Sequence, residues 1–416
     1  MLLLGIIIQK YLIYNNLGEA EMEIVKELEN IKESIIKWRR ELHMIPEVGL
    51  NLPKTAQYIK DRLSEMNIDF KTYEKHSGIT AVIGKKEGKT IAIRADMDGL
   101  PIKEECNLEF KSNTENMHAC GHDGHMAILL ATAKILKKHE DEINGKIKLI
   151  FQPCEECAPG GAEMMINDGV LENPKVDVIL ALHVDNKARN YKNGDFIVSY
   201  KSMFASDDPI NIKIEGKGGH ASIPNECVDP VAIGNLIVNN IQYILSREVN
   251  HTIPSLISFC GITTNTVSNN IIPNLVEIKG TTRNVDNNVR KYVLKRIKEL
   301  AVGMSRLMKA DCTVDFEGGC PAVINDYDMV EQFEKSVKSI FNEDEIHIID
   351  EYNMGAEDAG FFFEKIPGCY FLLYNPKAYE DEIVYPAHNS KFMMDDSVLY
   401  RGAAAFIKTA IDVLNS

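Results

Sequence analysis

The chain has 416 residues, of which 45% are hydrophobic and 26% are charged, and its formal net charge is −15. This length exceeds what one ordinary hydrophobic core fills, so we expect two domains, and the composition excludes a disordered chain. The excess of acidic residues argues against a nucleic-acid-binding surface, which needs clustered lysine and arginine side chains.

In chain order, the first part of the sequence alternates between helices and short strands. We expect two helices (23–44 and 51–66), two strands (80–83 and 90–93), a helix (126–138) and two further strands (146–151 and 176–182). Polar groups follow three of these strands, at Asp96 to Asp98, at Gln152 to Glu156 and at His183. Ligands gather at the carboxyl edge of parallel strands, so this order predicts a mostly parallel sheet with a site at one edge.

The pattern changes after Asp207. A strand (210–215), a helix (229–245), two strands (255–260 and 275–283), a helix (288–309) and a strand (313–316) form a self-contained unit of small-domain size. The chain then returns to a core strand (370–374) and a closing helix (397–414). We therefore expect an α/β domain, formed by residues 1–206 and 321–416, that is interrupted by a smaller α+β domain of residues 207–320.

The nine cysteines are scattered without the spacing of a disulfide-bonded scaffold, so we expect a reducing compartment, the cytoplasm. Cys154 and Cys157 have the spacing of a redox pair or of half a zinc ribbon, but no second such pair follows. The apolar run Met1 to Ile8 lacks a basic start and a cleavage site and is too short to span a bilayer, so we expect no membrane association. A start upstream of the natural one, with Met22 as the alternative, would explain this run.

Residues 117–125 contain one thiol, three imidazoles and one carboxylate within nine positions. These groups bind zinc and its first-row neighbours, and a Cys-x-His pair such as Cys120 and His122 can present two ligands from one turn. For an isolated cluster, a buried cysteine beside helix-capping histidines is the alternative interpretation.

Glu155 and Glu156 are adjacent just beyond a predicted strand. A solvated acidic turn is one interpretation. In an extended loop, however, neighbouring side chains point in different directions, so one glutamate can bind a metal while the other faces a water. A metal lowers the pKa of water from about 15.7 towards about 7, and a nearby carboxylate can then pass the proton to a leaving amine. This pair predicts hydrolysis.

Seven strings, in this order, span most of the chain: Ala95–Pro101, Met117–His125, Phe151–Glu156 with Gly160-Gly161-Ala162, Ala181–Val184, Gly216–Ala221, Gly355–Asp358 and His388. Together they resemble the amidohydrolase branch of the aminoacylase/carboxypeptidase G metallopeptidase family, which includes hippurate hydrolases, auxin-conjugate hydrolases and N-acetyldiaminopimelate deacetylases. The resemblance implies a dinuclear catalytic domain interrupted by a lid domain that also dimerises.

The resemblance also implies roles for individual residues. The metal ligands would be Cys120, His122, Glu156, His183 and His388, with Cys120 as the bridge. Glu155 would be the general base and Asp98 a carboxylate that orients a ligand, while Asp96 receives no role. Glu156 is followed by Cys157-Ala158-Pro159, where relatives more often carry glycines.

In the predicted lid, His220 resembles the family histidine that stabilises the oxyanion, often from the partner subunit, although a structural core histidine is the alternative. Asn270 and Arg283 resemble the pair that binds the free carboxylate of the substrate, and the planar fork of arginine suits that task.

The activity implied is hydrolysis of the amide bond of N-acyl amino acids, which are small-molecule substrates, by a homodimer. Each subunit would use two divalent metal ions, manganese or zinc, with cobalt or nickel as alternatives. N-acetyldiaminopimelate deacetylation, dipeptidase activity and a non-catalytic metal-binding scaffold are the alternative functions.

Overall fold

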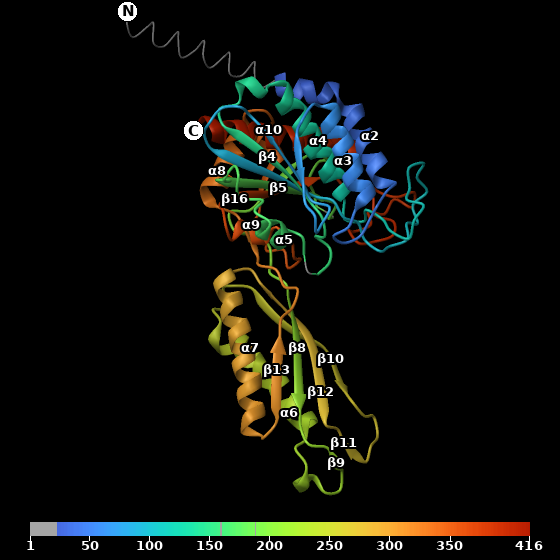
Figure 1. The fold of residues 1–416 in the computed structure, drawn as a ribbon, viewed down its shortest axis with the longest axis vertical. Coiled ribbons are helices and arrows are strands. Elements are labelled where there is room, and N and C mark those ends of the chain that lie inside the picture. The colour runs from blue at the N-terminus through green and yellow to red at the C-terminus, as the bar shows by residue number, and fades with distance from the viewer. Residues whose placement is uncertain (1–22, 159, 188) are drawn as a thin grey trace, which may run out of the picture. The chain divides into compact units, whose positions relative to one another are not determined.

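A computed structural model describes residues 23–158, 160–187 and 189–416. The apolar run Met1 to Ile8 and Pro159 lie outside these residues. The chain divides into two compact units (Figure 1). Unit 1 contains the residues up to Lys201 together with Asn325–Asp350 and Lys365–Ser416, and unit 2 contains Ser202–Ile324 and Glu351–Glu364.

Unit 1 is built on an eight-stranded sheet in the order β1-β2-β4-β3-β5-β16-β6-β15. The strands are β1 (Phe70–Thr72), β2 (Ile79–Ile83), β3 (Thr90–Asp96), β4 (Lys146–Gln152), β5 (Val178–Asp185), β6 (Phe196–Val198), β15 (Ile346–Ile348) and β16 (Gly368–Tyr374). The central run β4-β3-β5-β16 is parallel, which confirms the predicted mostly parallel sheet. Every residue of β3 and β16 is buried, as expected for strands covered on both faces.

The helices of unit 1 are α2 (Lys32–His43), α3 (Pro53–Glu65), α4 (His122–Lys138), α5 (Ala162–Asn167), α8 (Tyr327–Lys338) and α10 (Leu399–Asn415). Helix α4 is buried along most of its length and packs with α2 and α10, as Figure 1 shows. The helix begins at His122, four residues before the predicted start at Met126. His122 and His125 of the Cys/His cluster therefore lie in the first turn of the helix, whereas His118 and Cys120 precede it.

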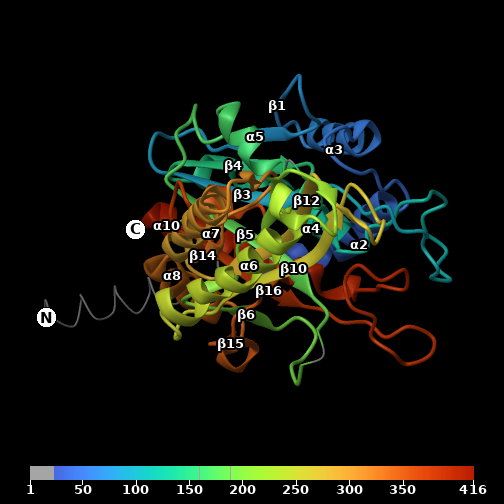
Figure 2. The ribbon, with the colours of Figure 1, turned by 90° about the horizontal axis from the view of Figure 1, so that it is seen from below.

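Unit 2 contains a four-stranded antiparallel sheet in the order β10-β12-β8-β13. These strands are β8 (Asp208–Glu215), β10 (Ser255–Thr264), β12 (Leu275–Asn284) and β13 (Asp311–Asp315). Helices α6 (Pro230–Tyr243) and α7 (Asn287–Leu307) lie side by side against this sheet (Figures 1 and 2). Asp229 and Asp286 cap them, each accepting two backbone N–H groups at the helix start.

Short elements complete unit 2: β7 (Ser202–Phe204), β9 (Gly219–His220), β11 (Ile271–Ile272), β14 (Val323–Ile324) and α9 (Gly360–Phe363). The segment Glu351–Glu364 belongs to this unit although it follows the expected boundary at residue 320. The backbone explains this, because the N–H of Ala205 donates to the carbonyls of Asn353 and Gly355 at 3.0 and 2.9 Å.

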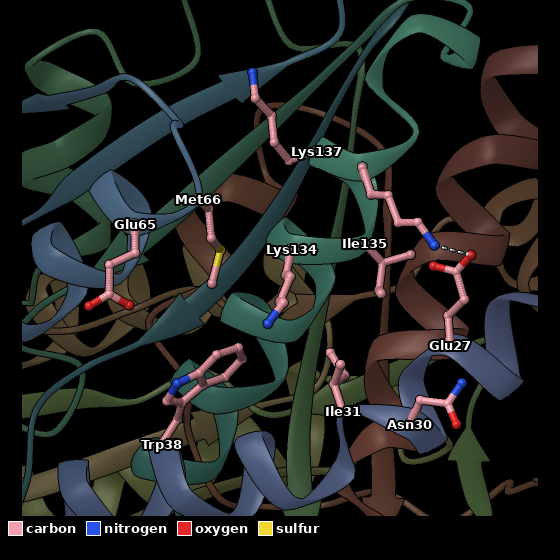
Figure 3. A pocket seen from close by; sticks show the side chains of 10 residues that line it. Glu27, Asn30, Ile31, Trp38, Glu65, Met66, Lys134, Ile135 and Lys137 are labelled. Atoms are coloured by element: carbon pink, nitrogen blue, oxygen red, sulfur yellow. Dashed lines mark ion pairs between the residues drawn. The ribbon is translucent and has the colours of Figure 1, made fainter.

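A pocket of about 600 Å³ lies among the helices of unit 1 (Figure 3). Trp38, Met66 and Ile135 contribute its apolar wall, and an ion pair between Lys138 and Glu27 at 2.8 Å borders it. None of its lining residues belongs to the predicted site. Within the described part of the chain, no helix is both long enough and apolar enough to cross a membrane.

Candidate active site

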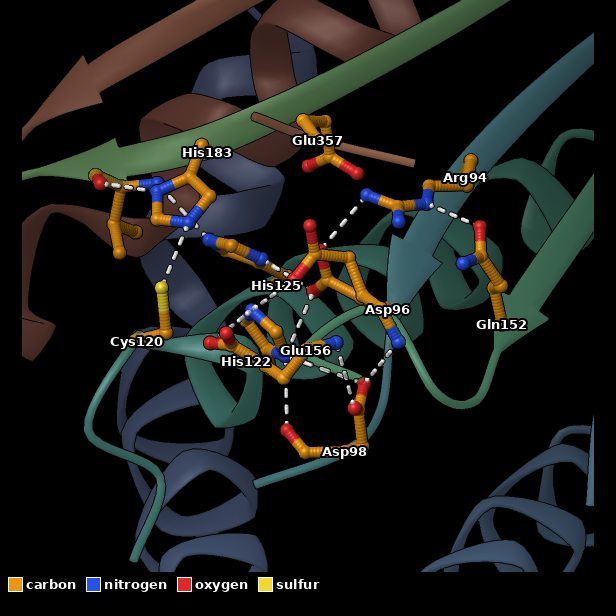
Figure 4. Close-up of polar contacts among 12 residues, drawn as sticks. Arg94, Asp96, Asp98, Cys120, His122, His125, Gln152, Glu156, His183 and Glu357 are labelled. Carbon is orange, nitrogen blue, oxygen red and sulfur yellow. Dashed lines mark hydrogen bonds and ion pairs between the residues drawn. The ribbon is translucent and has the colours of Figure 1, made fainter. Parts of the chain in front are cut away.

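The polar groups that follow β3, β4 and β5 meet at one edge of the sheet (Figure 4). Asp96 is the last residue of β3 and is paired in register with Gln152, the last residue of β4. His183 lies near the end of β5. Because these strands run parallel, their carboxyl ends bring side chains from three distant parts of the sequence together.

The turn that begins α4 passes close to β5 because Gly121 has no side chain. Gly121 has a φ of +90°, and a Cβ atom there would lie 2.3 Å from Cγ2 of Val184. Only glycine combines this backbone conformation with this close approach. The turn carries Cys120 before the glycine and His122 after it, and Sγ of Cys120 lies 3.3 Å from Nε2 of His183.

The five residues predicted as metal ligands gather into two overlapping groups, in each of which the possible ligand atoms lie within 4.8 Å of one another. The first group contains Cys120, His122 and His183, and the second contains Cys120, Glu156 and His388. Cys120 belongs to both groups, so its thiolate would contribute to both halves of a two-metal site.

Hydrogen bonds orient two of the imidazole rings. Nδ1 of His183 donates to the carbonyl of Val184 at 2.6 Å, and Nδ1 of His122 donates to the carbonyl of Asp98 at 2.8 Å. In their neutral forms, both rings therefore have the Nε2 lone pair available for a ligand. Nε2 of His122 is buried and finds no hydrogen-bond partner among the described residues. Such an atom is costly to bury, and a cation would satisfy it.

The electrostatics of this cluster also favour a cation. Burial alone would lower the pKa of His122, but the carboxylates of Asp96 and Asp98 outweigh it and raise that pKa to about 10. Burial, reinforced by Glu156, raises the pKa of the Cys120 thiol well above its ordinary value. Negative charge is therefore in excess here. A divalent cation would relieve this excess, and thiolate, imidazole and carboxylate suit such an ion.

Asp98 holds the loop that carries the two adjacent glutamates. Its carboxylate accepts the backbone N–H groups of Glu155 and Glu156 at 2.9 and 3.1 Å, and its backbone carbonyl accepts from His122. Asp98 is only 1% exposed. Oε2 of Glu155 lies 3.9 Å from Nε2 of His122, so this carboxylate borders the ligand cluster. Asp98 thus connects the glutamate loop to the first turn of α4.

Behind His183 lies a series of buried side chains, joined by polar contacts, for which the sequence predicted no role (Figure 4). Arg94 pairs with Asp96 at 2.8 Å, and Asp96 accepts from Nδ1 of His125 at 2.6 Å. Nε2 of His125 in turn accepts the backbone N–H of Val184 at 2.9 Å. Both ring nitrogens of His125 are thus used. An arginine inside the apolar run of β3 was the signal that could have revealed this series.

A second buried network, also not predicted, contacts the start of α4 through Asp123. Oδ2 of Asp123 accepts a hydrogen bond from Nδ1 of His43 at 2.8 Å and forms an ion pair with Nε of Arg39, also at 2.8 Å. Nε2 of His43 lies 3.3 Å from Glu104. Arg39 also lies 4.0 Å from Asp396, near the end of the chain. All these side chains are largely buried, so the turn with Cys120 and His122 rests on a network of paired charges.

In unit 2, His220 is an exposed residue of the two-stranded β9–β11 ribbon, not a core histidine. Nδ1 of His220 accepts the backbone N–H of Ser222 at 3.2 Å. The neutral ring therefore carries its hydrogen on Nε2, which leaves an N–H donor on the other side of the ring.

The structure does not bring Asn270 and Arg283 together within one copy of unit 2. Asn270 directly precedes β11, and its carbonyl accepts the N–H of Ala221, whereas Arg283 lies at the far end of β12. The eight residue-to-residue steps from Leu275 to Arg283 alone span about 27 Å at about 3.4 Å per step. Arg283 forms an ion pair with Asp207 at 2.6 Å.

Comparisons with known proteins agree with this geometry. Over 406 residues the chain is 37% identical to thermostable carboxypeptidase 1 of Saccharolobus solfataricus, covering 95% of this chain and all (100%) of that protein. It is 39% identical over 305 residues to an N-acyl-L-amino acid amidohydrolase of Geobacillus stearothermophilus, covering 73% of this chain and 81% of the relative.

Among solved structures, a dinuclear metal-binding peptidase of the M20 family from Bacillus subtilis has a TM-score of 0.77 and 28% sequence identity, covering 93% of this chain and 99% of that one. The sequence pattern of peptidase family M20/M25/M40 matches residues 92–412 of this chain. The site at the carboxyl edge of β4, β3 and β5 agrees with this match. The chain belongs to peptidase family M20/M25/M40.

Proposed function

We propose that this protein is a metal-dependent amidohydrolase that cleaves the amide bond of N-acyl amino acids and releases a carboxylic acid and a free amino acid. The observation that carries the proposal is the pair of ligand groups that share Cys120, next to the Glu155 carboxylate. The relative named N-acyl-L-amino acid amidohydrolase supports the same reaction.

Two divalent cations, manganese or zinc, with cobalt or nickel as alternatives, would be held by Cys120, His122, Glu156, His183 and His388. When bound, such ions polarise a substrate carbonyl and make a water molecule more acidic. The Nε2 lone pairs of His122 and His183 and the excess of negative charge support this assignment.

Glu155 would act as the general base. In this role its carboxylate takes a proton from the attacking water and later gives it to the nitrogen of the leaving amine. Asp98 would position Glu155, because it fixes the backbone N–H of that residue and of Glu156. The reacting carboxylate is thereby held beside the ligand cluster.

His220 would donate an N–H to the oxygen of the tetrahedral intermediate, a role supported by its hydrogen bond from Ser222. Arg283 and Asn270 would bind the free carboxylate of the substrate. Because one copy of unit 2 separates these two residues, we propose that the enzyme is a homodimer in which they serve different sites. We further propose that it works in the cytoplasm.

Carboxypeptidase or dipeptidase activity is the second candidate, favoured by the relative named thermostable carboxypeptidase 1. The chemistry is the same, since a peptide with a free terminal carboxylate is an N-acyl amino acid whose acyl group is itself a peptide. N-acetyldiaminopimelate deacetylation would differ in requiring a pocket for a second charged end.

The test is amine release from N-acetyl, N-benzoyl and N-indoleacetyl amino acids, N-acetyldiaminopimelate, dipeptides and N-blocked dipeptides. The enzyme is stripped with a chelator and reloaded with manganese or zinc, beside Glu155→Gln and the control Glu163→Gln, an exposed residue of α5. We expect metal-dependent release that only Glu155→Gln abolishes. Bound metal without turnover of any substrate would instead indicate a non-catalytic scaffold.

A further inference from the structure

Two cysteines flank the adjacent glutamates of the site. Sγ of Cys154 lies 3.2 Å from Sγ of Cys157 and 3.1 Å from the carbonyl oxygen of Cys157. Both thiols are free. We propose that Cys154 and Cys157 form a thiol–disulfide exchange site for small-molecule disulfides, and that the Cys154–Cys157 disulfide switches off amide hydrolysis by displacing the glutamates between them.

The backbone holds the two thiols near bonding distance. A disulfide bond is about 2.04 Å long, so the two sulfur atoms need to approach by only about 1.2 Å. The carbonyl of Cys154 accepts the N–H of Gly161, and the carbonyl of Cys157 accepts the N–H of Gly160, each at 2.9 Å. Backbone hydrogen bonds thus tie each cysteine to one of two adjacent glycines, and these bonds do not involve the cysteine side chains.

The two thiols differ in exposure, and this difference sets the order of reaction. Cys154 is only 1% exposed, whereas Cys157 is partly exposed. An incoming disulfide therefore reaches Cys157 first. The sulfur of Cys157 attacks one sulfur of the small disulfide, forming a mixed disulfide and releasing one small thiol. The sulfur of Cys154 then attacks the sulfur of Cys157 and releases the second small thiol.

This exchange balances without any further reactant. The two protein thiols are oxidised and lose two hydrogens, and the small disulfide is reduced to two thiols that take up the two protons. A dithiol reductant reverses both steps by the same chemistry. In a reducing compartment the pair is expected as two thiols, with the enzyme active.

The short loop from Cys154 to Cys157 links the disulfide to catalysis. This link rests on the proposed function of Glu155 and Glu156. Their backbone N–H groups are held by Asp98 at 2.9 and 3.1 Å, in a loop that the cysteines close at both ends. Drawing the two sulfur atoms together shifts the loop between them relative to Asp98 and strains these two hydrogen bonds. A displacement of about 1 Å at a reacting group can lower the rate about a hundredfold.

The test treats the full-length, manganese-loaded enzyme with oxidised glutathione and compares Cys154→Ser, Cys157→Ser and Cys260→Ser. Cys260 is an exposed cysteine of unit 2 and serves as the matched control. Three quantities are measured: the disulfide map by peptide mass spectrometry, the bound metal, and the rate of amide hydrolysis before and after dithiothreitol.

We expect the wild type and Cys260→Ser to form the Cys154–Cys157 disulfide and to lose at least tenfold in rate, with recovery in dithiothreitol. Cys154→Ser is expected to stop at a mixed disulfide of glutathione with Cys157. Cys157→Ser is expected to keep its own starting rate, which separates this site from oxidation of Cys120.

The proposal is overturned if the peptide map shows no Cys154–Cys157 disulfide, if the disulfide forms without a change in rate, or if Cys157→Ser is inactivated as strongly as the wild type. If the reduced enzyme hydrolyses no substrate, the proposed function fails instead. In that case the disulfide map and a change in bound metal still decide whether the exchange site exists and moves the loop.

Discussion

The two sheets of this protein bury their strands differently, and the difference explains where chemistry can be placed. In unit 1, strands β3 and β16 are buried at every residue, so polar ligands are confined to the strand ends. In unit 2, β8 alternates between buried and more exposed residues, as a sheet with one covered face does. The ligand groups are therefore complete within unit 1, whereas unit 2 presents separated, partly exposed polar residues.

Glu155→Gln tests the unit 1 side of this comparison with the largest expected effect. Removing the general base should lower kcat by about 10² to 10⁴, the range that proton transfer by a positioned side chain supplies. Metal content should stay unchanged because Glu155 is not among the proposed ligands. Steady-state kinetics and metal analysis measure both, and a parallel loss of metal would contradict this division of roles.

Arg39→Met tests whether the network behind α4 stabilises unit 1. Breaking the buried ion pair leaves Asp123 without its arginine partner and should cost about 3–5 kcal/mol in the free energy of unfolding. Lys37→Met, which removes an exposed ion pair on the same helix, should cost less than about 1 kcal/mol. Denaturant titration compares the two variants, and equal losses would argue against a structural role for the buried pair.

The ion pair between Arg39 and Asp123 predicts that the free energy of unfolding depends on pH. Burial alone would raise the pKa of Asp123, but Arg39 and His43 outweigh it and hold that pKa below its ordinary value. The pKa of Asp123 is lower in the folded state than its unfolded value of about 3.9. The ionised carboxylate therefore stabilises the folded protein at pH values above about 3.9. This contribution is lost as the pH falls below about 4, and Arg39→Met should show a smaller loss on acidification.

His220→Ala tests the unit 2 side. Loss of an oxyanion donor should lower kcat by about 10² to 10³, whereas His251→Ala, at another exposed histidine of unit 2, should leave kcat unchanged. If His220 serves the partner subunit, mixing His220→Ala with Glu155→Gln copies should restore up to roughly one quarter of the activity, as expected for random pairing in a two-fold dimer. No recovery in confirmed mixed dimers would place His220 in its own site.

His125→Phe has the smallest expected effect and sharpens the comparison within unit 1. The phenylalanine keeps the ring volume but removes the link between Asp96 and the backbone beside His183, so metal affinity should fall about 10- to 100-fold. His139→Phe, near the other end of α4, should leave metal affinity unchanged. Isothermal titration measures both, and identical affinities would show that β5 positions His183 without this series of side chains.

The sequence predicts the parallel sheet well and places the candidate ligands at the strand ends, because both features depend on local patterns. Apolar runs give the strands, and short strings at the strand ends carry Cys120, Glu156 and His183. The start of α4 is different: glycine and histidine have modest helix propensity, so the periodic pattern begins only at Met126. Packing of Gly121 against β5 moves the helix start to His122.

The supporting networks could not be read from the sequence. Arg94 and His125 are joined through Asp96, and Arg39 reaches Asp123 across 84 positions, so each contact exists only after the helices and strands have packed. The distance between Asn270 and Arg283 likewise depends on the strand register, which no motif encodes. Local strings identify the candidate ligands, whereas the contacts that support them are tertiary.

The ion pairs of Arg39 and Arg40 with Asp396 have a consequence for the synthesis of the protein on the ribosome. Arg40 and Asp396 are 356 positions apart, so a ribosome adds Asp396 long after the two arginines, and it adds His388 long after Cys120 and His122. A nascent chain therefore cannot complete the proposed ligand set until residue 388 has been added, nor these ion pairs until residue 396 has been added. Fragments released before these positions lack both, so the proposed hydrolase cannot act during most of its own synthesis.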